Sequence, residues 1–290
     1  MISPVVRKIG RIALCLVVVA VALAYLRRMP FAEMAKSLRG ARPIPIALAA
    51  LVYLGPNTAA RVRRWAALLA AAPRSGDAPG SFELARVLFA SQAASNLLPA
   101  RPGEAVRVVE LRNRGYGTAG LVAAQLYEKV VEAASLCLLG GVAASAAGIG
   151  IFHGAAWLPA AAATALLLVL FLSARLVGLG AAWARSFAWS CAADLADAAV
   201  LGLCLHSVGV DPGPSAWLVV LLAINVAILI PSTPGHLGVM EAGALAALLA
   251  LGVAPERALA GAVLYHAVQI LPGTALGLLA LRLGRVRSRA

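Results

Sequence analysis

Long apolar runs alternate with short polar segments along almost all of the 290 residues. A bilayer core about 30 Å thick is crossed by roughly 20 apolar residues in a helix. The pattern therefore predicts an all-α, polytopic membrane bundle of about seven to nine segments, within one domain covering residues 1–290. The candidate segments cover residues 12–27, 43–60, 82–98, 118–147, 155–174, 187–208, 216–231, 237–251 and 258–281.

Three of these segments, 82–98, 216–231 and 237–251, are short for a comfortable crossing. Backbone that is not helical at membrane depth is tolerated only where protein buries it or where it lines a wet cavity. We therefore expect broken or re-entrant segments here. In transporters, such segments are the best pointer that a sequence offers to a binding site.

Basic residues predict part of the topology, because cytoplasmic loops carry an excess of Lys and Arg. The loops at 99–117 and 175–186 are basic and are expected inside, whereas those near 148–154 and 209–215 contain no Lys or Arg and are expected outside. The C-terminus is expected in the cytoplasm because of four arginines, Arg282, Arg285, Arg287 and Arg289.

The N-terminal part is ambiguous, because residues 27–42 and 61–74 are both basic. The basic residues before 12–27 resemble a signal peptide, but no small-residue cleavage site follows, so we expect a retained first helix. If this N-terminus is cytoplasmic, one segment before residue 99 must enter and leave on the same face. We choose 82–98.

Composition excludes a water-soluble globular protein. The chain is 62% hydrophobic and 13% charged, with a mean hydropathy of +0.89, whereas soluble domains are about 45–50% apolar and about 25% charged. The net charge is +13, and the basic residues lie between the apolar runs. This position favours a role in topology and in contacts with anionic lipids over nucleic-acid binding. The four cysteines lie inside apolar segments without Cys-x-x-Cys spacing, which favours packing over metal binding or disulfides.

A weak internal repeat links two of the short segments. Residues 96–104 read NLLPARPGE, and residues 225–241 read NVAILIPSTPGHLGVME. Each begins with an Asn (Asn96, Asn225), continues through Pro-x-x-Pro-Gly and ends in a Glu (Glu104, Glu241). Matched broken segments are typical of inverted-repeat transporters; the alternative is two ordinary loops that share a pattern by coincidence.

Each Pro-x-x-Pro-Gly is expected to interrupt a helix, because proline lacks an N–H and glycine permits unusual backbone angles. The predicted breaks are Pro99, Pro102 and Gly103 in the first motif and Pro231, Pro234 and Gly235 in the second. A helix starting after Gly103 or Gly235 would direct its positive end at an anionic headgroup. Nearby, Arg101 and Arg107 could clamp a phosphate. Equally, these arginines could hold the loop at the lipid surface.

Ionisable residues inside the spans cost about 2.5–3.5 kcal/mol each at a helix centre. Glu128 and Glu132 are four residues apart on one helical face, and Asp194 and Asp197 are three apart on another. His266 lies deep in the last span. Ion pairs between helices explain these pairs as well as a substrate or proton path does. An ion pair between helices explains Glu241 less well, because Glu241 lies beside predicted broken backbone.

The sequence motifs give little support for an enzymatic activity. His206 and Asp211 have the H-x-x-x-x-D spacing of a glycerolipid acyltransferase, but they fall at an expected outer loop without a phosphate-binding motif. The chain contains no H-E-x-x-H, G-x-S-x-G or P-loop pattern. We therefore predict no catalytic residue, no metal and no cofactor.

Together these features resemble the membrane domain of lysylphosphatidylglycerol synthases and its stand-alone bacterial relatives. The resemblance covers roughly residues 10–285. Its matching features are Arg64-Trp65, the 96–104 motif with Arg107, Glu128-Lys129 with Glu132, and the motif 231–241.

The resemblance implies a multi-pass protein of the bacterial inner membrane that handles phospholipid, hopanoid or lipid-linked cargo. The family's membrane domain is implicated in lipid flipping, while a soluble domain, for which this chain has no room, transfers the aminoacyl group. The chain departs from the family where Glu128-Lys129 and Glu132 replace a frequent Glu-Arg and Asp, and where His266 replaces a frequent Arg. Pro102 and His236 also replace small residues.

The favoured hypothesis is therefore a lipid translocase whose broken segments line a cavity for an anionic headgroup. The alternatives are a membrane-embedded transferase in polyprenyl or hopanoid biosynthesis, with Glu128 or Glu241 as base, and an accessory scaffold for biosynthetic enzymes. The candidate substrate-binding residues are Asn96, Arg101, Glu104, Arg107, Glu128, Glu132, Asn225, Glu241 and His266.

Overall fold

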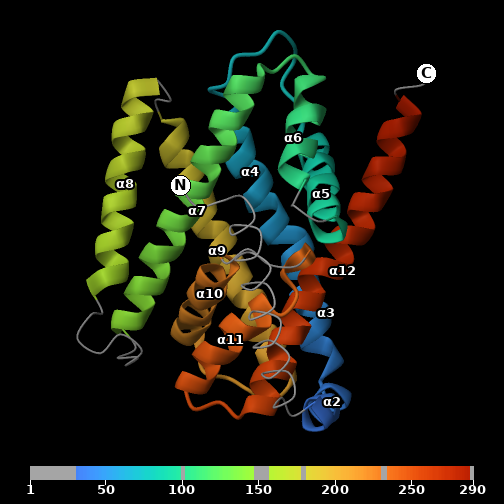
Figure 1. The fold of residues 1–290 in the computed structure, drawn as a ribbon, viewed down its shortest axis with the longest axis vertical. Helices are drawn as coiled ribbons and strands as arrows, with labels where there is room; N and C mark the ends of the chain where they lie inside the picture. The colour runs from blue at the N-terminus through green and yellow to red at the C-terminus, as the bar shows by residue number, and fades with distance from the viewer. Residues whose placement is uncertain (1–30, 99–101, 147–156, 178–180, 230–233, 288–290) are drawn as a thin grey trace, which may run out of the picture.

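A computed structural model describes residues 31–98, 102–146, 157–177, 181–229 and 234–287, and these residues are almost entirely helical (Figure 1). The candidate segment 12–27 lies outside the described residues. The helices are α2 (Phe31–Arg39), α3 (Pro43–Val52), α4 (Thr58–Leu69), α5 (Ser81–Leu97), α6 (Gly103–Arg112), α7 (Thr118–Ala146), α8 (Trp157–Val177), α9 (Ala182–Ser207), α10 (Pro214–Ile228), α11 (Val239–Ala250) and α12 (Pro255–Arg287). The predicted all-α membrane bundle is confirmed.

Within the described ranges, three helical stretches are long and apolar enough to cross a membrane: Pro43–Leu69, Ala182–Ser207 and Pro255–Arg282. The first corrects our boundary of 43–60, because helix continues to Leu69. Pro56 does not end it, since a π-helical turn at Tyr53–Asn57 joins α3 to α4 and such turns accommodate a local change in hydrogen bonding. Residues 61–69 of the basic stretch 61–74 are thus helical.

The first short segment is one arm of a re-entrant hairpin made by α5 and α6. Its two ends meet at one end of the bundle, where the Ser75 N–H donates to the Gly115 carbonyl at 3.0 Å and Arg114 pairs with Glu83. Figure 1 shows α5 descending to mid-bundle and α6 returning to the same end. The segment therefore returns to the end that it enters, as predicted for 82–98.

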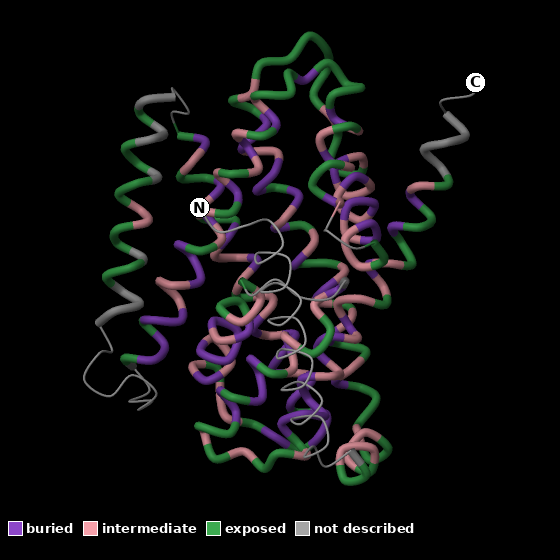
Figure 2. The backbone as a smooth tube through the Cα atoms, in the orientation of Figure 1, coloured by how far each residue is buried: buried purple, intermediate pink, exposed green. Residues whose placement is uncertain are grey.

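The second hairpin, made by α10 and α11, enters from the opposite end (Figure 1). The helices α7 and α9 run from the end that carries the first hairpin towards the other end, and α12 runs back. Two re-entrant hairpins of opposite direction are what an inverted repeat predicts. Figure 2 shows buried residues on the helices of both hairpins and on the long helices beside them, whereas the loops at the two ends of the bundle are mostly exposed.

The tip of the first hairpin, at the end of α5 near Asn96, lies against the tip of the second, which is the segment from Pro234 to Gly238 before α11. A Cβ added to Gly235 would lie 3.5 Å from the Asn96 carbonyl oxygen and 3.2 Å from Ile270 Cδ1 of α12. Gly235 has φ 67°, which glycine adopts without strain. As expected, α6 begins at Gly103, but α11 begins at Val239 rather than directly after Gly235, because the chain first makes a 3-10 turn at Pro234–His236.

Small residues allow α5 to approach α12 closely. Gly273 and Gly277 are one turn apart on α12, and Cβ atoms added there would collide with Gln92 and with the Phe89 carbonyl of α5, respectively. Apolar lipid tails compete with apolar helix faces, so close packing of this kind drives helix association in membranes. The first hairpin therefore packs closely against α12.

We predict that Gly277→Ala destabilises the folded protein by about 1–3 kcal/mol through overpacking. The matched control is Gly55→Ala, where no atom lies within 4 Å of the added Cβ. Alanine is the better helix former by about 1 kcal/mol, so the control is expected to be neutral or stabilising. Thermal unfolding in detergent measures both variants, and equal shifts would contradict the packing role of Gly277.

Candidate functional site

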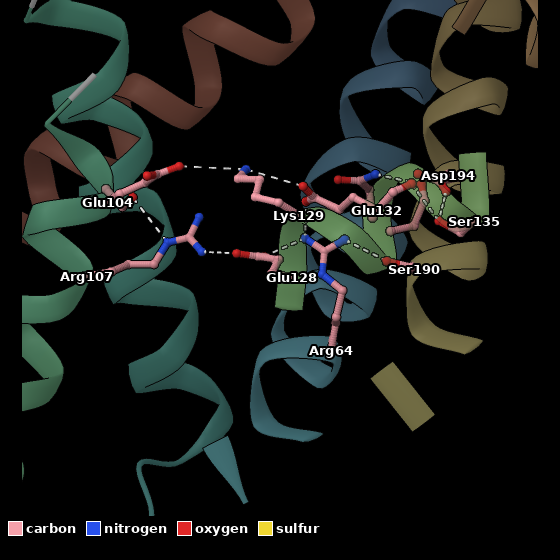
Figure 3. A network of polar contacts seen from close by, with 12 residues as sticks. Arg64, Glu104, Arg107, Glu128, Lys129, Glu132, Ser135, Ser190 and Asp194 are labelled. Atoms are coloured by element: carbon pink, nitrogen blue, oxygen red, sulfur yellow. Dashed lines mark hydrogen bonds and ion pairs between the residues drawn. The ribbon is translucent and has the colours of Figure 1, made fainter. Parts of the chain in front are cut away.

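Arg64 links three helices from a fully enclosed position. Its side chain is 2% exposed. Nη2 donates to Glu128 Oε1 at 2.7 Å and to Glu132 Oε1 at 2.5 Å, both on α7, and Nη1 donates to Ser190 Oγ on α9 at 3.1 Å (Figure 3). The continuation of helix to Leu69 places this guanidinium inside the protein.

Glu128 is held between two arginines. Its Oε2 accepts from Arg107 Nη1 of α6 at 2.5 Å, while Oε1 accepts from Arg64. Arg107 also donates from Nε to Ser91 Oγ at 3.3 Å, and its guanidinium carbon lies 4.8 Å from the centre of the Trp65 ring. Charge-assisted contacts on both oxygens stabilise a buried carboxylate that would otherwise be very costly.

The network becomes exposed at one edge. Lys129 Nζ lies 3.3 Å from Glu132 Oε2 and 4.0 Å from Glu104 Oε1. The side chains of Lys129 and Glu104 are 56% and 59% exposed. Figure 3 shows Lys129 between Glu104 and Glu132. We refer to Arg64, Arg107, Glu128, Glu132 and Ser190 as the arginine network.

Further polar contacts extend from the arginine network towards α12. On α9, Asp194 and Asp197 follow Ser190 by one and two turns. Ser135 Oγ donates to Asp194 Oδ2 at 2.5 Å, and Gln269 Nε2 of α12 donates to Asp197 Oδ1 at 3.0 Å. These four side chains join α7, α9 and α12 in the interior.

The first hairpin contributes polar side chains at the same depth. Gln92 Nε2 donates to the Tyr53 hydroxyl at 2.5 Å and to the Gln269 carbonyl at 3.3 Å. Asn96 Nδ2 donates to Thr274 Oγ1 at 2.9 Å. The polar contacts therefore reach the tip of the first hairpin, beside Gly235.

A separate pair holds the tip of the second hairpin. His266 Nδ1 lies 2.6 Å from Glu241 Oε1, and His266 Nε2 lies 2.7 Å from the Gly235 carbonyl oxygen. The remaining oxygen of Glu241, Oε2, accepts the Gly238 N–H at 2.8 Å at the start of α11. The His266 side chain is 4% exposed.

The structure brings some of the predicted site residues together and separates others. Arg107, Glu128 and Glu132 share the arginine network, while Asn96, Glu241 and His266 lie at the meeting point of the two tips. Asn225 is exposed, and its Nδ2 donates to the Leu221 carbonyl of its own helix. Pro99, Arg101 and Pro231 lie outside the described residues, whereas Pro102 precedes α6 and Pro234 begins the 3-10 turn.

The two motif glutamates have different neighbours. Glu104 lies beside Lys129, whereas Glu241 pairs with His266 because α11 packs against α12. Sequence reasoning missed Arg64 and Ser190 as site residues. The signal for Arg64 was its position next to Trp65 within a stretch that can continue as helix.

Within the described ranges, no group of three or more His, Cys, Asp or Glu residues could hold a metal ion. The charged side chains are instead joined to one another. Such an arrangement can exchange partners with a phosphate or an amine, since both offer charge-assisted hydrogen bonds of the same kind.

A family model described as lysylphosphatidylglycerol synthase TM region matches residues 11–181 and 174–277. The matched residues cover most of the chain, which therefore belongs to this family. A search of curated proteins found no match. Family membership indicates a multi-pass membrane protein with a lipid-related function, as the resemblance of the motifs implied.

We predict that Glu128→Gln destabilises the protein by about 3–5 kcal/mol, because it leaves two buried guanidinium groups without their shared carboxylate. The control is Glu110→Gln, which removes the Arg86–Glu110 pair, whose side chains are 18% and 29% exposed. That pair contributes about 0–1 kcal/mol. Thermal unfolding in detergent compares the variants, and a loss at Glu110 as large as at Glu128 would argue against the arginine network as the main constraint.

Proposed function

We propose that this member of the lysylphosphatidylglycerol synthase TM region family translocates membrane lipids across the bacterial inner membrane. In the proposal, the polar headgroup passes between the tips of the two hairpins and the arginine network while the acyl chains stay in the bilayer. The cargo is a phospholipid or lipid-linked intermediate whose phosphate is recognised by arginine. The observation that carries the proposal is the carboxylate of Glu128, which is held inside a membrane bundle by Arg64 and Arg107.

Buried charge in a membrane protein supports this function. Ionisable side chains within spans are expensive, and they mark substrate paths, ion paths or proton relays. Here the charged groups lie on α4, α6 and α7, and α6 is an arm of a re-entrant hairpin. In transporters, substrate sites lie near the midplane where such interrupted helices meet.

The hydrogen-bond donors of the arginine network favour an anionic ligand. Guanidinium groups match phosphate oxygens in a two-point geometry, so phosphate could replace Glu128 as an acceptor for Arg107. Arg64 keeps a further donor, because its buried Nε has no hydrogen-bond partner among the described residues. Trp65 stacks against Arg107 and keeps its guanidinium oriented.

The hairpin tips also suit the apolar part of a lipid. Leu97 and Leu98 near the first tip are 54% and 51% exposed, and Leu229 and Leu237 near the second are 81% and 60% exposed. Large apolar side chains are thus exposed close to Asn96, Glu241 and the other polar groups of the tips. A molecule with a charged head and apolar chains meets both surfaces at once.

The alternative is a membrane-embedded transferase that acts on a polyprenyl or hopanoid intermediate. Glu128 is a poor candidate for its base, because both of its oxygens accept from arginine. Glu241 fits better, since it lies beside the broken backbone and pairs with His266. A role as an accessory protein to biosynthetic enzymes would require neither site.

We predict that Arg107→Gln slows translocation of labelled phosphatidylglycerol in reconstituted liposomes by about tenfold or more, from the loss of charge-assisted bonds to phosphate. Arg107→Lys is expected to be intermediate, because it keeps the charge without the fork. The control is Arg112→Gln, an exposed position in the last turn of α6. Equal rates for Arg107→Gln and the control would remove Arg107 from the mechanism, and recovery of a chemically altered lipid would favour the transferase.

We also predict that both hairpin tips are reached by water. In a variant without native cysteines, Leu98→Cys and Leu237→Cys are expected to react with a water-soluble thiol reagent. The control is Leu172→Cys on α8, which is 52% exposed and is expected to face lipid, where a thiol stays protonated and unreactive. Tip cysteines that react no faster than the control would contradict a polar passage between the hairpins.

A further inference from the structure

The hydrogen bonds of His266 require more protons than a neutral histidine carries. Its two ring nitrogens face acceptors: Glu241 Oε1 at 2.6 Å and the Gly235 carbonyl oxygen at 2.7 Å. A neutral imidazole has one N–H and one lone pair. A carbonyl can only accept, and Glu241 already accepts the Gly238 N–H through its other oxygen. One of the two contacts therefore lacks a proton unless the pair has bound an additional one.

We propose that His266 and Glu241 form a proton-binding site whose proton fastens the tip of the second hairpin to α12. With the proton bound, the ring donates to both partners. The proton can also reside on Glu241, which then donates to Nδ1 while Nε2–H donates to the Gly235 carbonyl. When the proton leaves, a lone pair of the ring faces either the carboxylate or the carbonyl oxygen, and that contact must open.

Glu241 is the ionisable side chain that contacts the His266 ring directly. Among the described residues, α10 and α3 carry no ionisable side chain, and the only one on α11 is Glu241. The elements packed on α12 carry further ionisable side chains: Tyr53 in the π-helical turn, Glu83 and Arg86 on α5, and Arg185, Cys191, Asp194, Asp197, Cys204 and His206 on α9. On α12 itself they are Glu256, Arg257, Tyr265, Arg282, Arg285 and Arg287, and His236 lies on the tip. Asp197 is engaged by Gln269. Helix α2, which carries Glu33, Lys36 and Arg39, lies at the end of the bundle where α12 begins (Figure 1).

Release of this tip also affects its contact with the first hairpin. Gly235 packs against the Asn96 backbone of the first hairpin as well as against Ile270. Loss of the bond to His266 therefore loosens the contact between the tips. Any effect of the proton on lipid movement rests on the proposed function, whereas proton binding and release of the tip do not.

Hydrogen exchange of the protein in lipid nanodiscs tests the site without any transport assay. Between about pH 5 and pH 9, we expect residues 234–242 to become about tenfold or more less protected as the pH rises, because loss of the shared proton opens a contact of the tip. Rates are compared with an unfolded peptide of the same sequence. The internal reference is the turn at 112–117, which is held by backbone bonds such as Tyr116 N–H to the Leu111 carbonyl. Protection at the tip that does not change with pH would overturn the proposal.

The variant Glu241→Gln separates this site from a merely structural contact. A glutamine can accept from Gly238 with its oxygen and donate to Nδ1 of a neutral His266, whose Nε2–H still bonds the Gly235 carbonyl. The tip should therefore be fastened at high pH and released at low pH, when the ring gains a proton and two donors face each other. His266→Leu is expected to leave the tip about tenfold or more less protected at every pH. A Glu241→Gln variant that keeps the wild-type direction would overturn the proposal.

A direct measurement covers the case in which these variants do not fold. Replacing the other three histidines with Gln (His153, His206 and His236) leaves His266 alone for nitrogen NMR of its ring. We expect a proton on both ring nitrogens, or on one ring nitrogen and Glu241, at low pH, and loss of that extra proton as the tip loses protection. A single proton in the pair over the whole range would overturn the proposal.

Discussion

The carboxylate of Glu128, held between Arg64 and Arg107, is the constraint on which the rest of the site depends. Three charges that are nearly excluded from water come from α4, α6 and α7, and each is tolerable only while the others are in place. This requirement sets the position of α6, and with it the first hairpin, against the long helices. Because α5 also packs on the glycines of α12, that hairpin is anchored on two sides.

Much of the architecture could be predicted from local signals. The length and periodicity of apolar runs indicated the helices, and Pro-x-x-Pro-Gly indicated both breaks, because proline and glycine act on the backbone where they stand. Arg64 was missed for a related reason: a run of Arg61, Arg63 and Arg64 after Pro56 has the composition of a cytoplasmic loop. A π-helical turn absorbs the proline, so the helix continues and the guanidinium faces inwards.

Pairings between distant residues could not be predicted in this way. Glu241 was recognised as unusual because it follows broken backbone, yet its partner is 25 residues away on α12. Which helix faces α11 depends on the packing of the whole bundle, and no short pattern contains that information. The same holds for Ser190, which is an ordinary small residue in α9 until Arg64 reaches it. Sequence thus located the breaks, and tertiary structure determined what holds them.

The two hairpins are similar in shape and opposite in direction, but their anchors differ in chemistry. The first is held by arginines, which keep their charge at any physiological pH, and by close backbone contact with α12. The second is held by a histidine and a glutamate, whose bonds depend on a proton that can leave. An inverted repeat built from two permanent anchors would be rigid at its centre, and one built from two exchangeable anchors would lose its midplane contacts on both sides. Because one anchor is permanent and the other exchangeable, the second hairpin can move against a fixed partner.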